Sequence, residues 1–253
     1  MFRNDINKVF NYTSQMNAPI DKINMHEAWQ GQADCEKCSL RQSVLFADLD
    51  ESDFSQIHDP INQFHYNAGT RIYSSGEAGS KIYTIRSGLV KLVQYLPDGN
   101  YRIVRLMWPS DVIGLEVLVG QGYQHDAICL QGTEVCQIPR DSVNNLSLKN
   151  PVLHKSLMER WQKALSDADT WLTCLSTGTA RQRIARLVVE MADKHSSGLC
   201  CLFSREDMGA MLGVTTETVS RIIAEFKRDG LLIKKTSNCY QLNIAELNVI
   251  SGD

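Results

Sequence analysis

Three polar residues near the carboxyl end have the types and the spacing needed to bind the edges of DNA bases. Glu217, Ser220 and Arg221 occupy positions i, i+3 and i+4, so in a helix they share one face. An arginine can donate two hydrogen bonds to guanine, a carboxylate can accept one from a base amino group, and a hydroxyl suits several base edges. Solvated helix faces of this composition are common, so the neighbouring elements decide whether this chemistry is expected.

The segments around these residues predict two short helices joined by a tight turn. Ser204 followed by Asp207 is close to a capping box and starts a helix that Gly213 ends. Thr215 or Thr216 can cap the second helix. An apolar stripe at helical spacing is expected to face inward: Val219, Ile222, Ile223 and Phe226. The pattern is typical of a helix-turn-helix motif, whose second helix enters the major groove of DNA.

Further contacts are expected to DNA phosphates, which fix the register of a protein on the duplex without selecting a sequence. The candidates are polar groups near the two helix starts: Thr215, Thr216, Thr218 and Arg205. Beyond the second helix, the runs L-L-I-K-K and C-Y-Q-L-N flank residues 236–238 and predict a β-hairpin. The carboxyl-terminal region is therefore interpreted as a winged helix-turn-helix that binds double-stranded DNA.

The sequence from Cys35 to Leu242 resembles the CRP/FNR family of bacterial transcription regulators, and the FNR branch in particular. The run E-T-V-S-R at residues 217–221 matches the Glu-x-x-Ser-Arg motif of that branch. The resemblance implies a DNA half-site close to TTGAT, arranged as an inverted repeat that a homodimer binds. It also implies a transcription activator with RNA polymerase as a partner, and no enzymatic activity.

Length and composition indicate a globular protein with more than one domain. The chain has 253 residues, of which 43% are hydrophobic and 22% charged, and this length allows two separate cores. No early stretch has the pattern of a signal peptide, and no run approaches the roughly 20 apolar residues of a membrane span. We therefore expect a cytoplasmic protein with no membrane partner.

Charge is distributed unevenly along the chain. The net charge is −3, but residues 176–253 carry 10 Lys and Arg against 9 Asp and Glu, whereas residues 1–175 carry 16 against 20. A DNA-binding surface must therefore be a local basic patch, and its binding should depend strongly on salt. The expected members are Arg181, Arg205, Arg221, Lys227, Arg228, Lys234 and Lys235.

The order of predicted elements gives an α+β fold in four segments. From Phe64 to Pro139, short hydrophobic runs interrupted by glycine about every 8 to 12 residues predict an antiparallel sandwich or barrel. Its runs I-R-S-G and S-D-V-I-G resemble landmarks of the cyclic-nucleotide-binding β-roll. The expected segments are an amino-terminal arm with Cys-x-x-Cys (1–44), the β-roll sensor domain (45–148), a dimerisation helix (149–176) and the winged helix-turn-helix (177–253).

The predicted dimerisation helix has apolar residues spaced three and four apart, which is the signature of a two-helix seam. Its predicted seam residues are Leu153, Leu157, Trp161, Ala164, Ala168, Trp171 and Leu175. The alternative is a helix that lies against its own β-roll. The seam is favoured because an inverted-repeat DNA site requires two-fold symmetry in the protein.

Three cysteines are candidate metal ligands. The resemblance implies a [4Fe-4S] cluster held by three amino-terminal cysteines and one in the β-roll; Cys35, Cys38 and Cys136 match three of these positions. The family's third amino-terminal cysteine would fall at Val44, and an isopropyl group cannot bind iron. The fourth ligand would have to be external or one of several nearby residues: Asp34, Glu36, Asp48 or His26.

Other uses of the cysteines stay open at this point. A Cys-x-x-Cys pair can be a structural zinc site or a thiol–disulfide switch, and the β-roll can instead hold a small-molecule effector. Eight cysteines in a cytoplasmic chain of this size do not indicate a disulfide framework. Five of them are predicted to be packing residues: Cys129, Cys174, Cys200, Cys201 and Cys239.

Cyclic AMP is not an expected ligand. Cyclic-nucleotide binders of the family carry a Gly-Glu pair for the ribose and an Arg-Ser pair for the cyclic phosphate. This chain has Gly114-Leu115-Glu116, followed by Tyr123-Gln124-His125-Asp126 where the Arg-Ser pair would fall. A phosphate there would face a carboxylate without an arginine.

An enzymatic function is not expected from the motifs present. A cupin-like metal barrel needs two closely spaced histidines, and His58, His65, His125 and His154 lack that spacing. The sequence also has no Walker loop, nucleophile elbow or zinc-protease helix.

Overall fold

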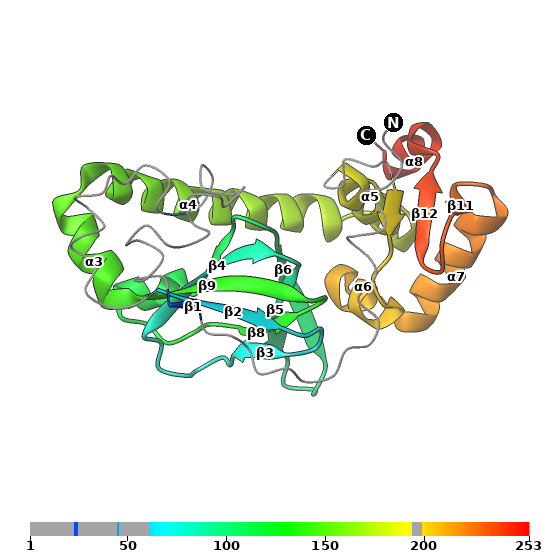
Figure 1. Cartoon of the computed structure of the whole chain (residues 1–253). Helices are drawn as coiled ribbons and strands as arrows, with labels where there is room; N and C mark the ends of the chain where they lie inside the picture. Colours follow the sequence, from blue (N-terminus) through cyan, green and yellow to red (C-terminus); the bar gives the residue numbers. More distant parts are fainter. Residues whose placement is uncertain (1–22, 25–44, 46–60, 194–198, 253) are drawn as a thin grey trace. The chain divides into compact units, whose positions relative to one another are not determined.

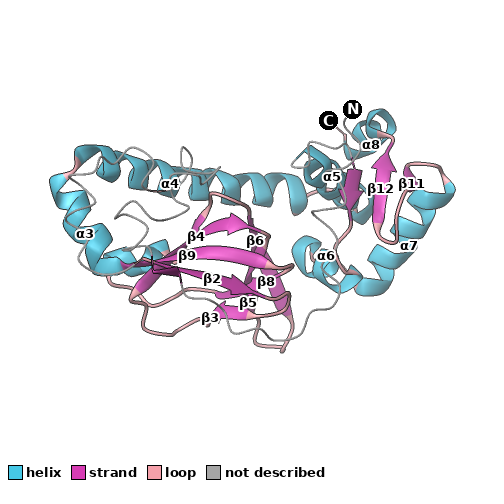
Figure 2. Ribbon diagram, viewed as in Figure 1, coloured by secondary structure: helices cyan, strands magenta, loops and turns pink. Residues whose placement is uncertain are grey.

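The computed structural model describes residues 23–24, 45, 61–193 and 199–252. The chain divides into two units: the first comprises residues 1–92 and 106–161, and the second comprises residues 93–105 and 162–253. Strands dominate the first unit, and most of the helices follow it in the sequence (Figures 1 and 2). The architecture is α+β, as the sequence predicts. Within the described ranges, no helix is both long and apolar enough to span a membrane.

Two antiparallel sheets form the β-roll, and residues 93–105 of its strands β5 and β6 belong to the second unit. One has the strand order β1-β2-β9-β4-β7 and the other β3-β8-β5-β6. The strand bounds are β1 Ile23–Asn24, β2 Asn62–Tyr66, β3 Arg71–Tyr73, β4 Lys81–Ser87, β5 Val90–Tyr95, β6 Tyr101–Met107, β7 Val112–Ile113, β8 Asp126–Cys129 and β9 Thr133–Pro139. Both sheets bury large apolar side chains, among them Ile82, Ile85, Val90, Ile103 and Val135, which is the arrangement of a β-roll with one shared core.

Gly88 illustrates why glycine separates these strands. It has a φ of 90° between β4 and β5, and a Cβ atom there would lie 2.4 Å from the carbonyl oxygen of Gly132. Only glycine tolerates both the backbone conformation and the close approach. A turn also forms at Pro97-Asp98-Gly99, where the Leu96 amide donates to the Asn100 carbonyl oxygen at 2.8 Å.

A 3-10 turn lies within the β-roll, and three helical segments follow the last strand. The turn is Leu115–Val119, between β7 and β8, and α3 spans Arg140–Lys149. The long helix α4 covers Pro151–Thr170 and continues as a π-helical turn at Trp171–Leu175. Residues 176–179 then leave the helical conformation.

From Ala180 onward, the second unit is built from four helices and a small sheet. The helices are α5 Ala180–Asp193, α6 Arg205–Leu212, α7 Thr216–Arg228 and α8 Ile244–Ser251. The strands β10 Leu199–Cys201, β11 Leu232–Lys234 and β12 Cys239–Leu242 form an antiparallel sheet in the order β10-β12-β11. Four apolar residues on one face of α5 are buried: Ile184, Leu187, Val188 and Met191.

Candidate nucleic-acid interface

Helix α6 begins and ends at the residues that the sequence indicates. The Ser204 hydroxyl accepts a hydrogen bond from the Asp207 amide at 3.0 Å and donates one to its carboxylate at 2.8 Å. Gly213 ends the helix with a φ of 64°, a conformation that favours glycine. Gly209 is a requirement that sequence reasoning missed: a Cβ atom there would lie 2.6 Å from the Val214 carbonyl oxygen. The absent side chain lets the turn pack closely on α6.

Helix α7 has one buried face and one exposed face. Val219, Ile222, Ile223 and Phe226 are buried, with Phe226 at 0% exposure. Glu217, Ser220 and Arg221 are all exposed. The apolar stripe fixes the rotation of the helix, and this rotation leaves the acid, the hydroxyl and the guanidinium accessible from outside the unit.

The first turn of α7 is held by Thr215. Its hydroxyl accepts a hydrogen bond from the Thr218 amide at 3.2 Å, which caps the helix. The pKa of the Glu217 carboxyl is lowered by a hydrogen bond with its own amide and by a second one with the Thr215 hydroxyl. Glu217 is therefore ionised at neutral pH and can accept hydrogen bonds. Thr216 is exposed beside it.

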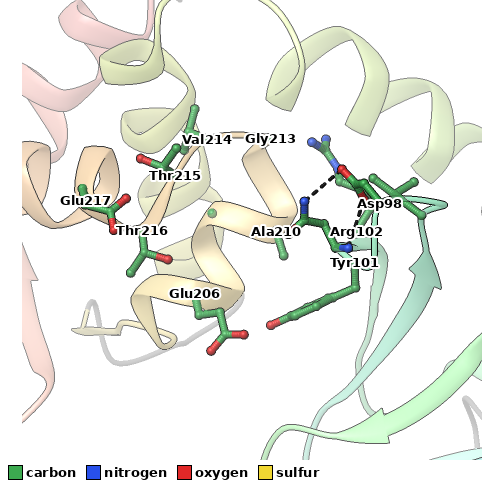
Figure 3. Close-up of a pocket in the computed structure, with 13 residues that line it drawn as sticks. Asp98, Tyr101, Arg102, Glu206, Ala210, Gly213, Val214, Thr215, Thr216 and Glu217 are labelled. Atoms are coloured by element: carbon green, nitrogen blue, oxygen red, sulfur yellow. Dashed lines mark hydrogen bonds between the residues drawn. The ribbon is translucent and has the colours of Figure 1, made fainter.

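A polar groove lies next to this turn, in the second unit (Figure 3). It has a volume of about 560 Å³ and is lined by the hairpin tip between β5 and β6, by α6 and by the start of α7. The Tyr101 hydroxyl lies 3.2 Å from Asp207 Oδ1, to which it donates. Burial, followed by the charge of Asp207, raises the pKa of Tyr101, so this hydroxyl stays protonated. Sequence reasoning gave no signal for this contact between segments distant in the chain.

Some residues of the predicted basic patch are exposed, and others form contacts within the protein. Arg221, Arg228, Lys234 and Lys235 are exposed. Arg181 was expected in the same patch, but it forms ion pairs with Glu225 at 3.2 Å and Asp229 at 3.5 Å and packs over the Phe226 ring. Its charge is thus used to attach α5 to α7, and we remove it from the expected DNA-facing patch.

Arg205 and Lys227, also predicted in the basic patch, contact other residues of the protein. Arg205 is half-buried with its Nη1 atom 3.5 Å from Met208 Sδ, and burial lowers its guanidinium pKa. The Lys227 ammonium lies 4.7 Å from the centre of the Tyr240 ring. This contact packs α7 against β12, the wing strand.

Arg186 holds the residues that follow the long helix, a role that sequence reasoning missed. It donates to the carbonyl oxygens of Cys174 at 2.9 Å and Thr177 at 3.0 Å, and twice to that of Ser251. One guanidinium therefore connects the break after α4 to α5 and to the end of α8. Isolated carbonyl groups at helix ends need such donors.

Helix α4 presents an apolar stripe that shares only Trp161 and Ala168 with the predicted one. Leu153, Leu157 and Leu175 are buried within the single chain, so we correct their assignment to a seam. From Met158 into the π-helical turn, large exposed side chains recur at spacings of three, four and seven: Met158, Trp161, Leu165 and Leu172. Ala168, half-buried, completes a regular three-and-four spacing. The helix thus has a buried side and a separate exposed apolar side.

Only one of the predicted metal ligands lies in the described residues. Cys136 is half-buried in β9, where it pairs directly with Gln63 of β2 and Thr84 of β4. Cys35 and Cys38 lie outside the described residues. In the part of the chain that the structure covers, no group of three or more His, Cys, Asp or Glu side chains is arranged to hold a metal ion.

Two cysteines predicted to be packing residues are in fact joined. Cys201 and Cys239 form a disulfide between β10 and β12. The prediction failed because it depended on burial, whereas the pairing register of these two strands places the residues directly opposite one another. Cys129 and Cys200 are buried, as expected for packing residues, whereas Cys174 is exposed.

The β-roll contains a buried carboxylate. Asp126 is 5% exposed, and its Oδ2 atom lies 3.1 Å from Arg71 Nε. Its Oδ1 atom accepts a hydrogen bond from the Ser75 amide at 2.8 Å. Tyr73 and Tyr123 stack with ring centres 3.8 Å apart. The carboxylate thus already has its own cationic and hydrogen-bonding partners.

Several characterised proteins are similar to this chain. Transcriptional activator protein FnrA of Stutzerimonas stutzeri is 29% identical over 210 residues, covering 80% of this chain and 86% of the relative. The fumarate and nitrate reduction regulatory protein of Vibrio cholerae is 26% identical over 225 residues, covering 86% and 90%. The structure of FixK2 from Bradyrhizobium japonicum aligns with a TM-score of 0.70 and 27% identity, covering 75% of this chain and 96% of that chain.

Family models match both halves of the described structure. The cyclic nucleotide-binding domain matches residues 63–150 and the Crp-like helix-turn-helix domain matches residues 182–250. A β-roll of this type joined to a Crp-like helix-turn-helix defines a DNA-binding transcription regulator. The chain belongs to the CRP/FNR family, in its FNR-like branch.

Proposed function

We propose that the protein recognises an inverted repeat of TTGAT-like half-sites through Glu217, Ser220 and Arg221. The observation that carries this proposal is that α7 has one buried face and one exposed face. Its apolar residues are buried inside the unit, and these three side chains are exposed. Their chemistry matches base edges in the major groove. Thr215, Thr216, Thr218 and Arg205 are proposed to contact phosphates, which position the helix.

A binding titration tests the proposal. A labelled duplex with two inverted TTGAT half-sites is compared with a duplex of the same composition in scrambled order, at several salt concentrations. We expect the full chain to prefer the repeat by at least about 1,000-fold, with affinity falling steeply as salt rises. Equal affinity for the two duplexes would reject sequence-specific recognition.

We further propose that the protein acts as a homodimer joined through α4. The exposed stripe of Met158, Trp161, Leu165 and Leu172 supports this, because a second copy can cover apolar side chains spaced in this way. Two-fold symmetry would place two α7 helices about one DNA turn apart, roughly 34 Å. Replacing Leu165 with Glu is expected to give monomers in sedimentation analysis, with Lys163→Glu on the same helix as the charge control. Dimers of unchanged stability in the Leu165→Glu variant would contradict this seam.

An iron-sulfur cluster is the proposed sensor, with Cys35, Cys38 and Cys136 as its ligands. Cys136 suits the role of a donor, because it lies on the same sheet face as Thr84, whose buried hydroxyl has no hydrogen-bond partner among the described residues. A cluster bound there would supply a group that oxygen or nitric oxide destroys. Iron and sulfide assays of anaerobically purified protein test the idea, and iron-free protein that still binds the repeat would reject it.

Other signals are the second candidate. A thiol–disulfide change or a small-molecule effector in the β-roll would leave the DNA-binding role unaltered. Cyclic AMP is disfavoured because Asp126 would face its phosphate, and this carboxylate is already paired with Arg71. Isothermal titration with cyclic AMP is expected to give no heat of binding.

The cellular role follows from the family. Relatives at 26–29% identity carry names of transcriptional activators or regulators, so we infer that this protein activates transcription by contacting RNA polymerase. Its target being chromosomal DNA, we infer that it acts in the cytoplasm. A run-off transcription assay with and without the protein tests the sign of regulation.

A further inference from the structure

The wing of the second unit contains a cysteine pair that DNA recognition does not use. Cys201 ends β10 and Cys239 begins β12, and the two are direct partners in the antiparallel ladder. Their disulfide joins positions with a sequence separation of 38. Both residues are partly exposed. The ladder itself holds the two side chains on one face of the sheet, so the bond can form or break without a change of strand pairing.

Burial separates this pair from two other strand thiols, those of Cys200 and Cys129. Cys200 is 0% exposed, and burial raises its pKa to about 12. Burial also raises the pKa of Cys129. Because the thiolate is the form that attacks a disulfide, both buried thiols are poor reactants. Cys201 and Cys239 are the strand cysteines of the second unit that a dissolved thiol reagent can reach.

The disulfide lies where the wing meets the start of α6. The Leu202 amide donates to the Asn238 carbonyl oxygen at 3.1 Å, and the Asn238 side chain donates to the Leu202 carbonyl oxygen. The amides of Lys235 and Thr236 donate to the Cys239 carbonyl oxygen at 3.0 and 3.2 Å. The crosslink therefore connects the base of the wing turn, with its lysines, to the segment that leads into the Ser204 cap of α6.

We propose that Cys201 and Cys239 form a reversible redox site that sets the affinity of the wing for DNA. In the oxidation, the two thiols lose two protons and two electrons as their S–S bond forms. A small disulfide such as glutathione disulfide accepts them, its own S–S bond breaks, and two thiol molecules are released. A dithiol reductant reverses the reaction.

The conformational freedom of the wing determines which redox form binds DNA more tightly. The reduced wing samples more conformations, so more entropy is lost when Lys234 and Lys235 become ordered against DNA. The crosslink removes part of that freedom before binding. The oxidised protein therefore binds DNA about 3 to 10 times more tightly than the reduced protein. This inference rests on the proposed DNA-binding function.

The test uses the full chain equilibrated in glutathione buffers and then trapped with N-ethylmaleimide. Peptide mass mapping reports the state of each cysteine, and fluorescence anisotropy with the inverted TTGAT duplex reports affinity. We expect a Cys201–Cys239 crosslink in glutathione disulfide and the stated affinity difference. The difference should disappear in Cys239→Ser and Cys201→Ser and persist in Cys174→Ser, the exposed control.

Three results would overturn the inference: both cysteines staying reduced in glutathione disulfide, equal affinities of the two redox forms, or a redox effect retained in Cys239→Ser. If no form prefers the repeat over scrambled DNA, the proposed function fails separately. Hydrogen exchange at the Lys235 and Thr236 amides would then decide the remaining question. Slower exchange in the oxidised form supports a wing restrained by the crosslink, and identical exchange refutes it.

Discussion

Replacing Arg186 with Met should destabilise the second unit more than the loss of any surface ion pair. Its guanidinium makes four hydrogen bonds to three carbonyl oxygens, two of them to Ser251 in a partly buried position and two to Cys174 and Thr177 in an exposed one. We assign about 1 kcal/mol to each partly buried bond and about 0.5 kcal/mol to each exposed bond, which gives a loss of about 3 kcal/mol. For a protein of this size, the melting temperature should fall by about 6 to 12 °C.

Thermal unfolding followed by circular dichroism measures this effect. Arg140→Met is the matched control, because Arg140 pairs with the neighbouring Asp141 at the surface of the first unit, and its loss should cost less than about 0.5 kcal/mol. Hydrogen exchange in Arg186→Met should accelerate at residues 174–179 and in α8. If the two variants melt within about 2 °C of one another, Arg186 does not hold the break after α4 as argued.

Three further outcomes can be checked. Ser204→Ala removes the cap of α6 and should lower the free energy of unfolding by about 1 kcal/mol, whereas Ser237→Ala in the exposed wing turn should change it little; equal losses would dismiss the capping role. Burial raises the pKa of Cys200 to about 12, so its proton stays on in the folded state and is lost earlier on unfolding. The contribution of this thiol to the free energy of unfolding is therefore present below the ordinary thiol pKa and should fall as pH rises from about 9 towards 12. At pH 8, alkylation should modify Cys174 and spare Cys200. Equal labelling of the two would contradict the burial of Cys200. Reducing the Cys201–Cys239 bond, whose sequence separation is 38, should lower stability by up to about 4 kcal/mol in denaturant titrations, and an unchanged midpoint would argue against the crosslink.

Much of the fold could be predicted from local sequence signals. The glycine-separated hydrophobic runs correspond to β3, β4, β5, β6, β8 and β9, and the caps of α6 and α7 lie at Ser204 and Thr215. These features depend on residues close together in the chain. For the same reason, the exposed and buried faces of α7 followed directly from the spacing of its apolar residues.

Helices α3 and α8 were not predicted from the sequence, because their sequence patterns are weak. Helix α3 is rich in Asn and Ser, which are poor helix formers, and buries Val143 and Leu146 over barely one turn. Helix α8 is short, and its polar residues Glu246, Asn248 and Ser251 are scattered among apolar ones, so it shows little periodicity. Its cap at Asn243, which accepts a hydrogen bond from the Glu246 amide, was the available sign.

The remaining errors concern contacts between segments distant in the chain. Helix α4 carries two apolar stripes, and its sequence alone does not indicate that Leu153 and Leu157 are the buried pair. The Cys201–Cys239 bond depends on the strand register, and the carbonyl oxygens bound by Arg186 belong to backbone positions that leave no mark in the sequence.

The most direct measurement concerns the guanidinium of α7 and one base pair of the half-site. The affinities of the wild-type protein and of Arg221→Ala are measured for the inverted TTGAT duplex and for a duplex in which each half-site reads TTAAT. The wild-type protein should prefer the first duplex by about 1 to 3 kcal/mol per half-site, and Arg221→Ala should bind both duplexes with nearly equal, weakened affinity. If Arg221→Ala keeps the wild-type preference, this helix does not recognise the guanine through Arg221 and the account of recognition is wrong.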